Sequence, residues 1–282
     1  MVLKEALGAI GDGTIKGMIQ SEFLIDTGKT CQIHNAPVYR RTRPKGKESE
    51  FCIACQHNER DKKRTQVDVA YQNQAILSNG YSIFNRESIF SNELKKADFT
   101  TFEVIKQIDE RAKNYADRLI RDFIKGIDGN AIIQGEPGVG KSFLAMAIAK
   151  KLNVTYKDFR QSKSVIFVST SMLVRLVQDS FKYSESKYSQ DRITKLLIDC
   201  DILILDDLGK ESSSGSTIKP AGDWTYRFLF NILDNRKSTI FTTNFTVKEL
   251  QQIYDKALVD RVLKGSKDKI FVYPKETESK RS

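Results

Sequence analysis

The second part of the chain, from about Phe99 onward, alternates between two spacings of apolar residues. Short apolar runs, typical of strands buried on both faces, occur at 131–133, 164–168, 201–205, 238–243 and 269–272. Segments with apolar residues at helical spacing lie between them, at 102–126, 143–149, 170–183, 224–236 and 247–254. Helices and strands that alternate in this way predict a parallel α/β sheet.

The first 97 residues follow a different pattern. Residues 1–28 show no clear period, 59–74 predict a charged, solvent-exposed helix, and 82–96 look irregular after a turn signal at Asn79-Gly80. A chain of 282 residues suits two domains. We therefore predict an N-terminal domain over 1–97 and a larger α/β domain over 98–282, with a polar, basic tail from residue 275 that we expect to be disordered.

The most informative motif connects the strand at 131–133 to the helix that begins near Phe143. Its glycines let successive backbone N–H groups point at phosphates, and the helix N-terminus adds its positive dipole end. Lys141 would reach the β- and γ-phosphates, and Ser142 would ligate Mg²⁺. The alternative is a glycine-rich turn before a core helix. This P-loop predicts a nucleoside triphosphate site formed by Gly135, Glu136, Pro137, Gly138, Val139, Gly140, Lys141, Ser142 and Phe143.

Polar residues end two of the other predicted strands. Asp206 and Asp207 follow the strand at 201–205, about 65 residues after the P-loop, and Asn244 follows the strand at 238–243. At the carboxyl ends of parallel strands, Asp206 would hold Mg²⁺ and Asp207 would orient or deprotonate the attacking water. Asn244 would bond the γ-phosphate or that water, or else cap the next helix. Asp207 is one methylene shorter than a glutamate, which leaves its catalytic role less secure than the metal role of Asp206.

Composition limits the setting and the partners. The chain has no apolar run long enough to span a membrane and no signal-peptide core after Met1, so we expect a cytoplasmic protein with no membrane partner. Four cysteines, three of them near the N-terminus, argue against a disulfide scaffold. A formal net charge of +10 is compatible with a polyanionic partner, but many solvated surfaces carry as much.

Two ligand pairs in the N-terminal domain predict a metal site. They are Cys31-x-x-His34 and Cys52-x-x-Cys55, and three thiolates with one imidazole suit structural Zn²⁺. His57 is an alternative nitrogen ligand, and four unconnected side chains are the plainer alternative. The domain is poor in core residues, so the metal would supply much of its folding free energy. The basic loop 39–47 would contact nucleic acid or a partner, or is simply a solvated turn.

Taken together, these motifs resemble those of the DnaC/DnaI helicase loaders of the AAA+ superfamily, including phage-encoded versions. The resemblance covers about residues 97–272. It rests on the P-loop GEPGVGKS (135–142), VRLVQDSF (174–181), LILDDLG (203–209), TTNF (242–245) and VDRV (259–262) in this order. The N-terminal cluster also looks like that of DnaI-type loaders.

The resemblance implies an AAA+ core with sheet order 5-1-4-3-2, in which Lys141, Asp206, Asp207 and Asn244 serve ATP hydrolysis. Arg261 matches the arginine finger of the family, which enters the ATP site of a neighbouring subunit and thus implies self-association in trans. Without the family, Arg261 would be interpreted as a surface arginine paired with Asp260. No residue is identified as a second sensor.

The helix after the second strand resembles an element that lines the single-stranded DNA path in initiators and loaders. Arg175, Lys182 and Lys187 are its candidates for backbone phosphates, although each is also explained by solvation. The apolar residues Leu173, Leu176, Val177 and Phe181 fit packing in the core.

We therefore expect an ATPase, slow and stimulated by its partners, that loads a hexameric replicative helicase onto single-stranded DNA as part of the primosome. The N-terminal domain would bind the helicase, and ATP, Mg²⁺ and Zn²⁺ would be the cofactors. A transposase-helper ATPase of the IstB type is the first alternative. An adaptor that uses ATP only as a structural ligand is the second.

Overall fold

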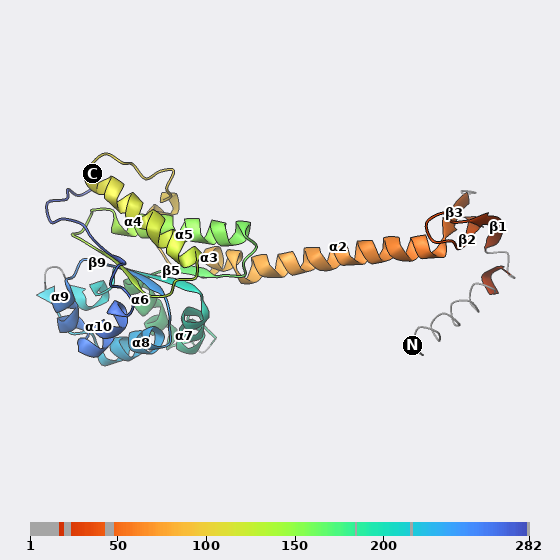
Figure 1. Ribbon diagram of the computed structural model, residues 1–282. Coiled ribbons are helices and arrows are strands. Elements are labelled where there is room, and N and C mark those ends of the chain that lie inside the picture. Colours follow the sequence, from red (N-terminus) through yellow and green to blue (C-terminus); the bar gives the residue numbers. More distant parts are fainter. Residues whose placement is uncertain (1–16, 20–23, 43–47, 184, 215–216, 281–282) are drawn as a thin grey trace. The chain divides into compact units, whose positions relative to one another are not determined.

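The computed structural model describes residues 17–19, 24–42, 48–183, 185–214 and 217–280 (Figure 1). The chain forms two compact units, residues 1–72 and 73–282. Residues 43–47 of the basic loop and most of the segment 1–28 lie outside the described residues. None of the described helices is both long enough and apolar enough to cross a bilayer.

The first unit contains a small antiparallel sheet followed by a helix. Strands β1 (Ile25–Thr30), β2 (Pro37–Thr42) and β3 (Glu48–Cys52) pair in that order, and α2 (Ile53–Asn79) begins directly after β3. Among the described residues of this unit, only Leu24 and Cys52 are buried. So small a core stabilises a fold weakly without a further cross-link.

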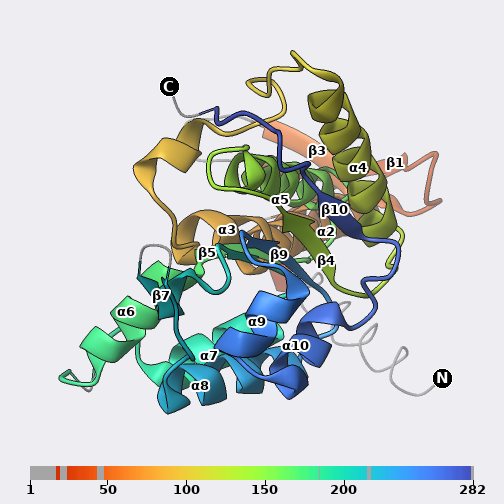
Figure 2. The ribbon, with the colours of Figure 1, turned by 90° about the vertical axis from the view of Figure 1, so that its left-hand side faces the viewer.

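The second unit is built on a five-stranded parallel sheet (Figure 2). Its strands are β4 (Ala131–Gln134), β5 (Val165–Ser169), β6 (Ile202–Asp206), β9 (Thr239–Thr243) and β10 (Ile270–Val272). They lie in the order β10-β4-β9-β6-β5, which reads 5-1-4-3-2 when they are numbered along the chain. The predicted α/β fold with a parallel sheet is confirmed.

Helices cover both faces of this sheet because alternate strand residues point to opposite sides. On one face, Ile133, Phe167 and Ile204 pack with α4 (Gln107–Ile124) and α5 (Lys141–Asp158). On the other face, Ile132, Ile166 and Leu205 pack with a second group of helices. These are α6 (Thr170–Ser180), α7 (Gln190–Asp199), α8 (Asp223–Asp234), α9 (Val247–Ile253) and α10 (Lys256–Leu263).

The sequence pattern missed several helices and misplaced the ends of others. The segment expected to be irregular contains α3 (Tyr81–Glu87) and a 3₁₀ helix at Asn92–Lys96. α7 and α10 were not predicted, because each is short and follows another helix without an intervening strand. The predicted helix 59–74 is the longer α2, and the segment between β6 and α8 contains the short strands β7 (Ser213–Ser214) and β8 (Thr217–Ile218).

Residues 73–97 belong to the second unit, although the predicted domain boundary lies at 97/98. Phe84, Ile89 and Ala97 are buried in the core of that unit. Ile89 also pairs with the outer strand β5: its N–H donates to Phe167 O (2.8 Å), and its C=O accepts from the N–H of Ser169 (2.8 Å). This segment is therefore part of the packed core of the second unit.

A buried arginine connects the ends of three elements on one side of the sheet. Arg236 is 5% exposed and follows α8. Its guanidinium donates to carbonyl oxygens at the end of α7, including that of Cys200 (2.8 Å), and to Ser238 O before β9 (2.9 Å). Because the last carbonyl groups of a helix have no partner within the helix, Arg236 acts as a C-terminal cap for α7.

Replacing Arg236 by Met should lower the free energy of unfolding by about 3 kcal/mol, because several buried carbonyl groups lose their donor. Urea unfolding followed by circular dichroism measures this change. Arg111→Met, at an exposed position of α4, is the control and should change stability by less than about 0.5 kcal/mol. Equal stabilities of the two variants would contradict the capping role.

Candidate functional site

The P-loop follows β4 and ends at the first turn of α5, as predicted. Gly138 and Gly140 have φ angles of +90° and +98°, in the region that glycine adopts without steric cost. At Gly135 a Cβ atom would lie 2.7 Å from Cβ of Tyr273, so a side chain there would displace β10 or the loop. These three glycines permit the curl that turns backbone N–H groups toward a phosphate.

Lys141 is 4% exposed and lies inside the loop. Its Nζ donates to the carbonyl oxygens of Gly135 and Glu136, both at 2.9 Å. These contacts hold the ammonium group at the centre of the P-loop. A bound phosphate would give it a stronger, charged acceptor at the same place.

Asp206, at the carboxyl end of β6, is 3% exposed and lies next to Ser142, whose side chain is hydrogen-bonded to it. Burial and then the charge of Asp207 raise the pKa of Asp206 to about 6. A divalent cation would remove the cost of burying this carboxylate, and a serine hydroxyl beside an aspartate offers the hard oxygen ligands that Mg²⁺ prefers. The pair predicted to hold Mg²⁺ is thus brought together.

Thr242 of β9, which the sequence analysis did not single out, holds the carboxylate of Asp206 and the backbone of Asp207. Its hydroxyl donates to Asp206 Oδ1 (2.6 Å) and accepts from the N–H of Asp207 (2.8 Å). Asp207 has a φ of +58°, uncommon for a residue other than glycine, and its carboxylate pairs with Lys210 Nζ (2.9 Å). In the sequence, Thr242 could have been identified by its position in a buried strand, two residues before Asn244.

Asn244 lies just beyond β9, at the edge of a cavity that Lys141, Ser142 and Asp207 also line. Its Oδ1 is buried and has no hydrogen-bond partner among the described residues. An unsatisfied buried amide oxygen costs about 1–3 kcal/mol. A group that donates to it, such as the attacking water, would recover this free energy, which agrees with the role predicted for Asn244.

Lys141, Ser142, Asp207 and Asn244 line one cavity of about 320 Å³. Part of its wall comes from the segment before α4 and from the C-terminal tail, neither of which the sequence analysis assigned to the site. The rings of Phe102 and the predicted Phe143 lie 6.0 Å apart and form an apolar side. The lining residues are Glu93, Leu94, Thr101, Phe102, Glu103, Pro137, Gly138, Gly140, Lys141, Ser142, Phe143, Asp207, Lys210, Asn244 and Lys280.

Arg261 is not among the residues that line this cavity. It lies on α10, where its Nε pairs with Asp234 Oδ1 at 2.5 Å and its guanidinium stacks over the ring of Phe230 (5.4 Å). The alternative partner considered from the sequence was Asp260, whereas the observed partner is Asp234 of α8. The side chain is 37% exposed, so a neighbouring molecule could reach it.

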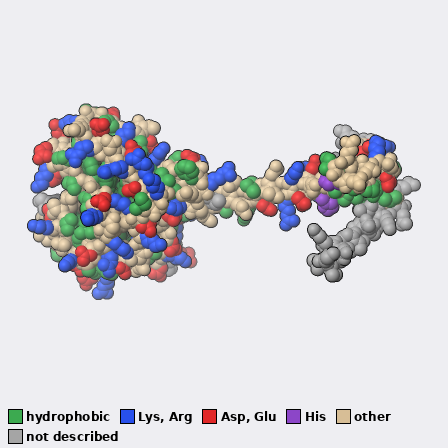
Figure 3. All heavy atoms as spheres, in the orientation of Figure 1, with side chains coloured by type: hydrophobic (Ala, Val, Ile, Leu, Met, Phe, Trp, Pro, Cys, Tyr) green, Lys and Arg blue, Asp and Glu red, His purple; other side chains and the backbone are tan. Residues whose placement is uncertain are grey.

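The three basic residues suggested for DNA lie on or after α6, and none of them lines the cavity. Arg175, Lys182 and Lys187 are all exposed. Lys187 stands over the ring of Tyr188 at 4.8 Å. Figure 3 shows Lys and Arg side chains interspersed with acidic ones over the visible face of this unit, without a single large basic patch.

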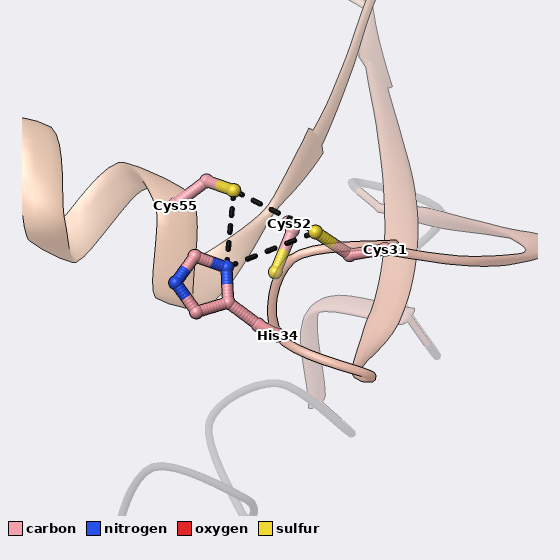
Figure 4. Close-up of side chains that lie close together, drawn as sticks. All are labelled: Cys31, His34, Cys52 and Cys55. Carbon is pink, nitrogen blue, oxygen red and sulfur yellow. Dashed lines mark hydrogen bonds between the residues drawn. The ribbon is translucent and has the colours of Figure 1, made fainter.

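The four predicted metal ligands converge in the first unit (Figure 4). Cys31 and His34 lie after β1, Cys52 ends β3, and Cys55 lies in the first turn of α2. Their ligand atoms all lie within 4.8 Å of one another. Hydrogen bonds from the backbone and ring of His34 lower the pKa of Cys31 to about 6, while the neighbouring Cys31 thiol and burial raise that of Cys55 to about 11.

The distances fit a tetrahedral ion. Cys31 Sγ and Cys55 Sγ are 3.7 Å apart, and two sulfurs on one Zn²⁺ would be roughly 3.8 Å apart at the usual Zn–S length. The ring Nδ1 of His34 faces the sulfurs, 3.2 Å from Cys55 Sγ, and Nε2 bonds Asn58 on its other side (3.0 Å). The cluster contains His34 and not His57.

The sequence profile of the family described as "IstB-like ATP binding protein" matches residues 64–281. The chain belongs to this family. It is an AAA+ P-loop ATPase that binds ATP. The match begins after the Cys/His cluster, so the cluster lies outside the part that defines the family.

Two solved structures show the same fold. The DnaC helicase loader is 22% identical, with a TM-score of 0.51 over 65% of this chain and 100% of that one. DnaI is 21% identical, with a TM-score of 0.50 over 70% of this chain and 97% of that one. No curated protein matches the sequence. The likeness to DnaC and DnaI bears out the resemblance found in the sequence as a likeness of fold.

The purified protein should contain about one Zn²⁺ per chain, bound by the Cys/His cluster. His34→Ala should lose the metal because it removes one of four ligands, whereas the matched variant His57→Ala should retain it. Elemental analysis by mass spectrometry, with a chromogenic chelator to follow release, measures both. Full metal content in His34→Ala would show that the cluster is not the site.

If Asn244 orients the attacking water, Asn244→Ala should lower kcat for ATP hydrolysis about 10- to 100-fold, because its unpartnered amide oxygen is lost. ATP affinity should change by less than about threefold, since the P-loop remains intact. Asn231→Ala, at an exposed position of α8, serves as the matched control. Steady-state hydrolysis and ATP titration test this, and a loss of affinity at unchanged kcat would contradict it.

Proposed function

We propose that this ATPase loads a hexameric replicative DNA helicase onto single-stranded DNA, with the Cys/His unit binding the helicase. The observation that carries the proposal is the pairing of an AAA+ ATPase unit with a separate Cys₃His unit in one chain. In such an arrangement, one unit would recognise the partner protein, while the other would change conformation when it binds ATP with Mg²⁺.

The surface of the first unit favours a protein partner over nucleic acid. Arg40 of β2 is neutralised by Glu48 (3.5 Å) and Glu50 (3.1 Å), and Lys29 pairs with Glu50 as well (2.8 Å). Basic side chains held by acids are poor ligands for phosphates. Apolar side chains are exposed on the same unit instead, with Ile33 80% exposed beside the metal cluster.

The second unit offers the groups for single-stranded DNA. Arg175, Lys182 and Lys187 are exposed near the aromatic side chains of Phe181 and Tyr188. Basic groups next to aromatic rings suit a strand whose bases stack while its phosphates are neutralised. The three cations are few, so binding would be weak for one molecule and stronger for several side by side.

Self-association is the second element of the proposal. Arg261 reaches solvent and takes no part in the cavity of its own chain, as expected of a group that acts on a neighbour's ATP. Its pair with Asp234 would be exchanged for the γ-phosphate when molecules assemble. Hydrolysis would then depend on assembly on the helicase, with slow turnover by the free protein.

A transposase-helper ATPase remains the second candidate, because the family that the chain belongs to is described by IstB. That function would be indicated by binding of duplex DNA and recruitment of a transposase. The Cys/His cluster lies before the matched residues and supports the loader instead.

The full chain should co-purify with the replicative helicase of its host, and a protein that starts at Asn73 should not, because it lacks the Cys/His unit. Ile33→Glu should weaken capture at least about tenfold by burying a charge in the contact, with zinc content unchanged. Val67→Glu, at a position of α2 that is 66% exposed, is the control. Pull-down and calorimetric titration measure these effects.

Lys141→Ala should still bind the helicase but should fail to load it onto single-stranded DNA. Loading at the wild-type rate would refute the ATP-dependent part of the proposal. If neither the full chain nor the shortened one binds the helicase, the transposase-helper function is favoured, and ATP binding is unaffected by that outcome.

A further inference from the structure

The C-terminal tail runs across the P-loop. β10 pairs in parallel with β4, and the N–H of Tyr273 continues the pairing to Gln134 O (2.8 Å). The chain therefore leaves the sheet beside the loop that follows β4, and Figure 2 shows it passing the N-terminal end of α5. The disorder predicted for the tail is wrong for residues 275–280, and residues 281–282 lie outside the described residues.

The tail is bonded to the outer side of the loop. The N–H of Lys280 donates to Gly138 O at 2.8 Å. Ser279 packs so closely on Gly138 that a Cβ atom there would collide with the serine hydroxyl. The tail bonds a carbonyl group of the loop. The N–H groups that a P-loop turns toward its ligand therefore remain available to a phosphate.

Two ion pairs fasten the tail to the start of α4. Lys280 Nζ lies 2.5 Å from Asp109 Oδ1, and Lys106 Nζ lies 2.8 Å from Glu278 Oε2. Asp109 is 2% exposed and also accepts the backbone N–H groups of Ile105 (3.2 Å) and Lys106 (2.9 Å). Charge-assisted bonds to a buried carboxylate are stronger than pairs in solvent.

Lys280 is also part of the cavity wall. Its side chain crosses the ring of Phe102 at 5.2 Å, and its Cδ would be 3.6 Å from a Cβ atom at Gly140. Phe102, Gly138 and Gly140 line the same cavity. The tail thus touches the apolar side and the phosphate loop of the ATP site at once.

We propose that residues 278–280 form a strap that retains the bound nucleotide, and that Lys280 is a positioning residue for the P-loop. The Asp109–Lys280 pair anchors the strap, and the Lys280–Gly138 bond holds the loop in its phosphate-binding conformation. Release of nucleotide requires the strap to detach. The proposal rests on ATP binding alone and is independent of helicase and DNA.

The test measures how fast a fluorescent ATP analogue dissociates from the full-length protein by stopped flow. Lys280→Met should raise the dissociation rate about tenfold, as expected from loss of one charge-assisted bond to a buried group. A chain that ends at Thr277 should release the ATP analogue at least as fast as Lys280→Met does. Lys280→Arg should stay close to wild type, and Lys267→Met, at an exposed lysine outside the strap, should equal wild type.

Further measurements distinguish a positioning role of Lys280 from a contribution to the stability of the fold. KM for ATP should rise in Lys280→Met while kcat stays within about twofold, and the melting temperature without nucleotide should change by less than about 2 °C. In an Asp109→Asn background, Lys280→Met should have little further effect, because the pair is already broken.

Three results would overturn the proposal. Unchanged dissociation from the chain that ends at Thr277 would show that the strap does not retain nucleotide. Slower dissociation from it would show that the tail competes with nucleotide. Faster release from Lys280→Met with an equal loss of thermal stability would assign Lys280 a structural role only.

Discussion

Strand β4 runs parallel between β9 and β10, and the backbone hydrogen bonds on both of its edges bring the three carboxyl ends to one level. The P-loop, Asn244 and the C-terminal tail are the segments that leave these ends. β6, next to β9, adds Asp206 and Asp207. Groups that are more than a hundred residues apart in sequence thus meet because a parallel sheet aligns the exits of its strands.

Within this arrangement, one hydroxyl group sets the finer geometry. Thr242 bonds the carboxylate of Asp206 and the backbone of Asp207, so the two acids cannot move independently of β9. Asn244 follows two residues later, just after the end of β9. A shift of β9 relative to β6 would therefore disturb the relative positions of Asp206, Asp207 and Asn244 all at once. Thr242 thus couples the positions of these residues to the position of β9.

The fold and most of the site could be predicted from the sequence, because the P-loop, the Asp206-Asp207 pair and Asn244 each carry their chemistry in a short local pattern. The helices α7 and α10 could not, because each is short and follows another helix without a strand between them. Lys280 was missed for another reason. Its role depends on Asp109 and Gly138, which are distant in sequence, and a basic tail looks the same whether it is packed or solvated.

The bridge between Ile89 and β5 has a consequence for any shortened form of the protein. β5 is the outer strand of the sheet, and residues 88–90 cover its free N–H and C=O groups. A fragment that begins at residue 98 would leave this edge bare, and bare edges pair with one another between molecules. Such a fragment would form aggregates by strand addition, and these could be mistaken for an assembly built through Arg261.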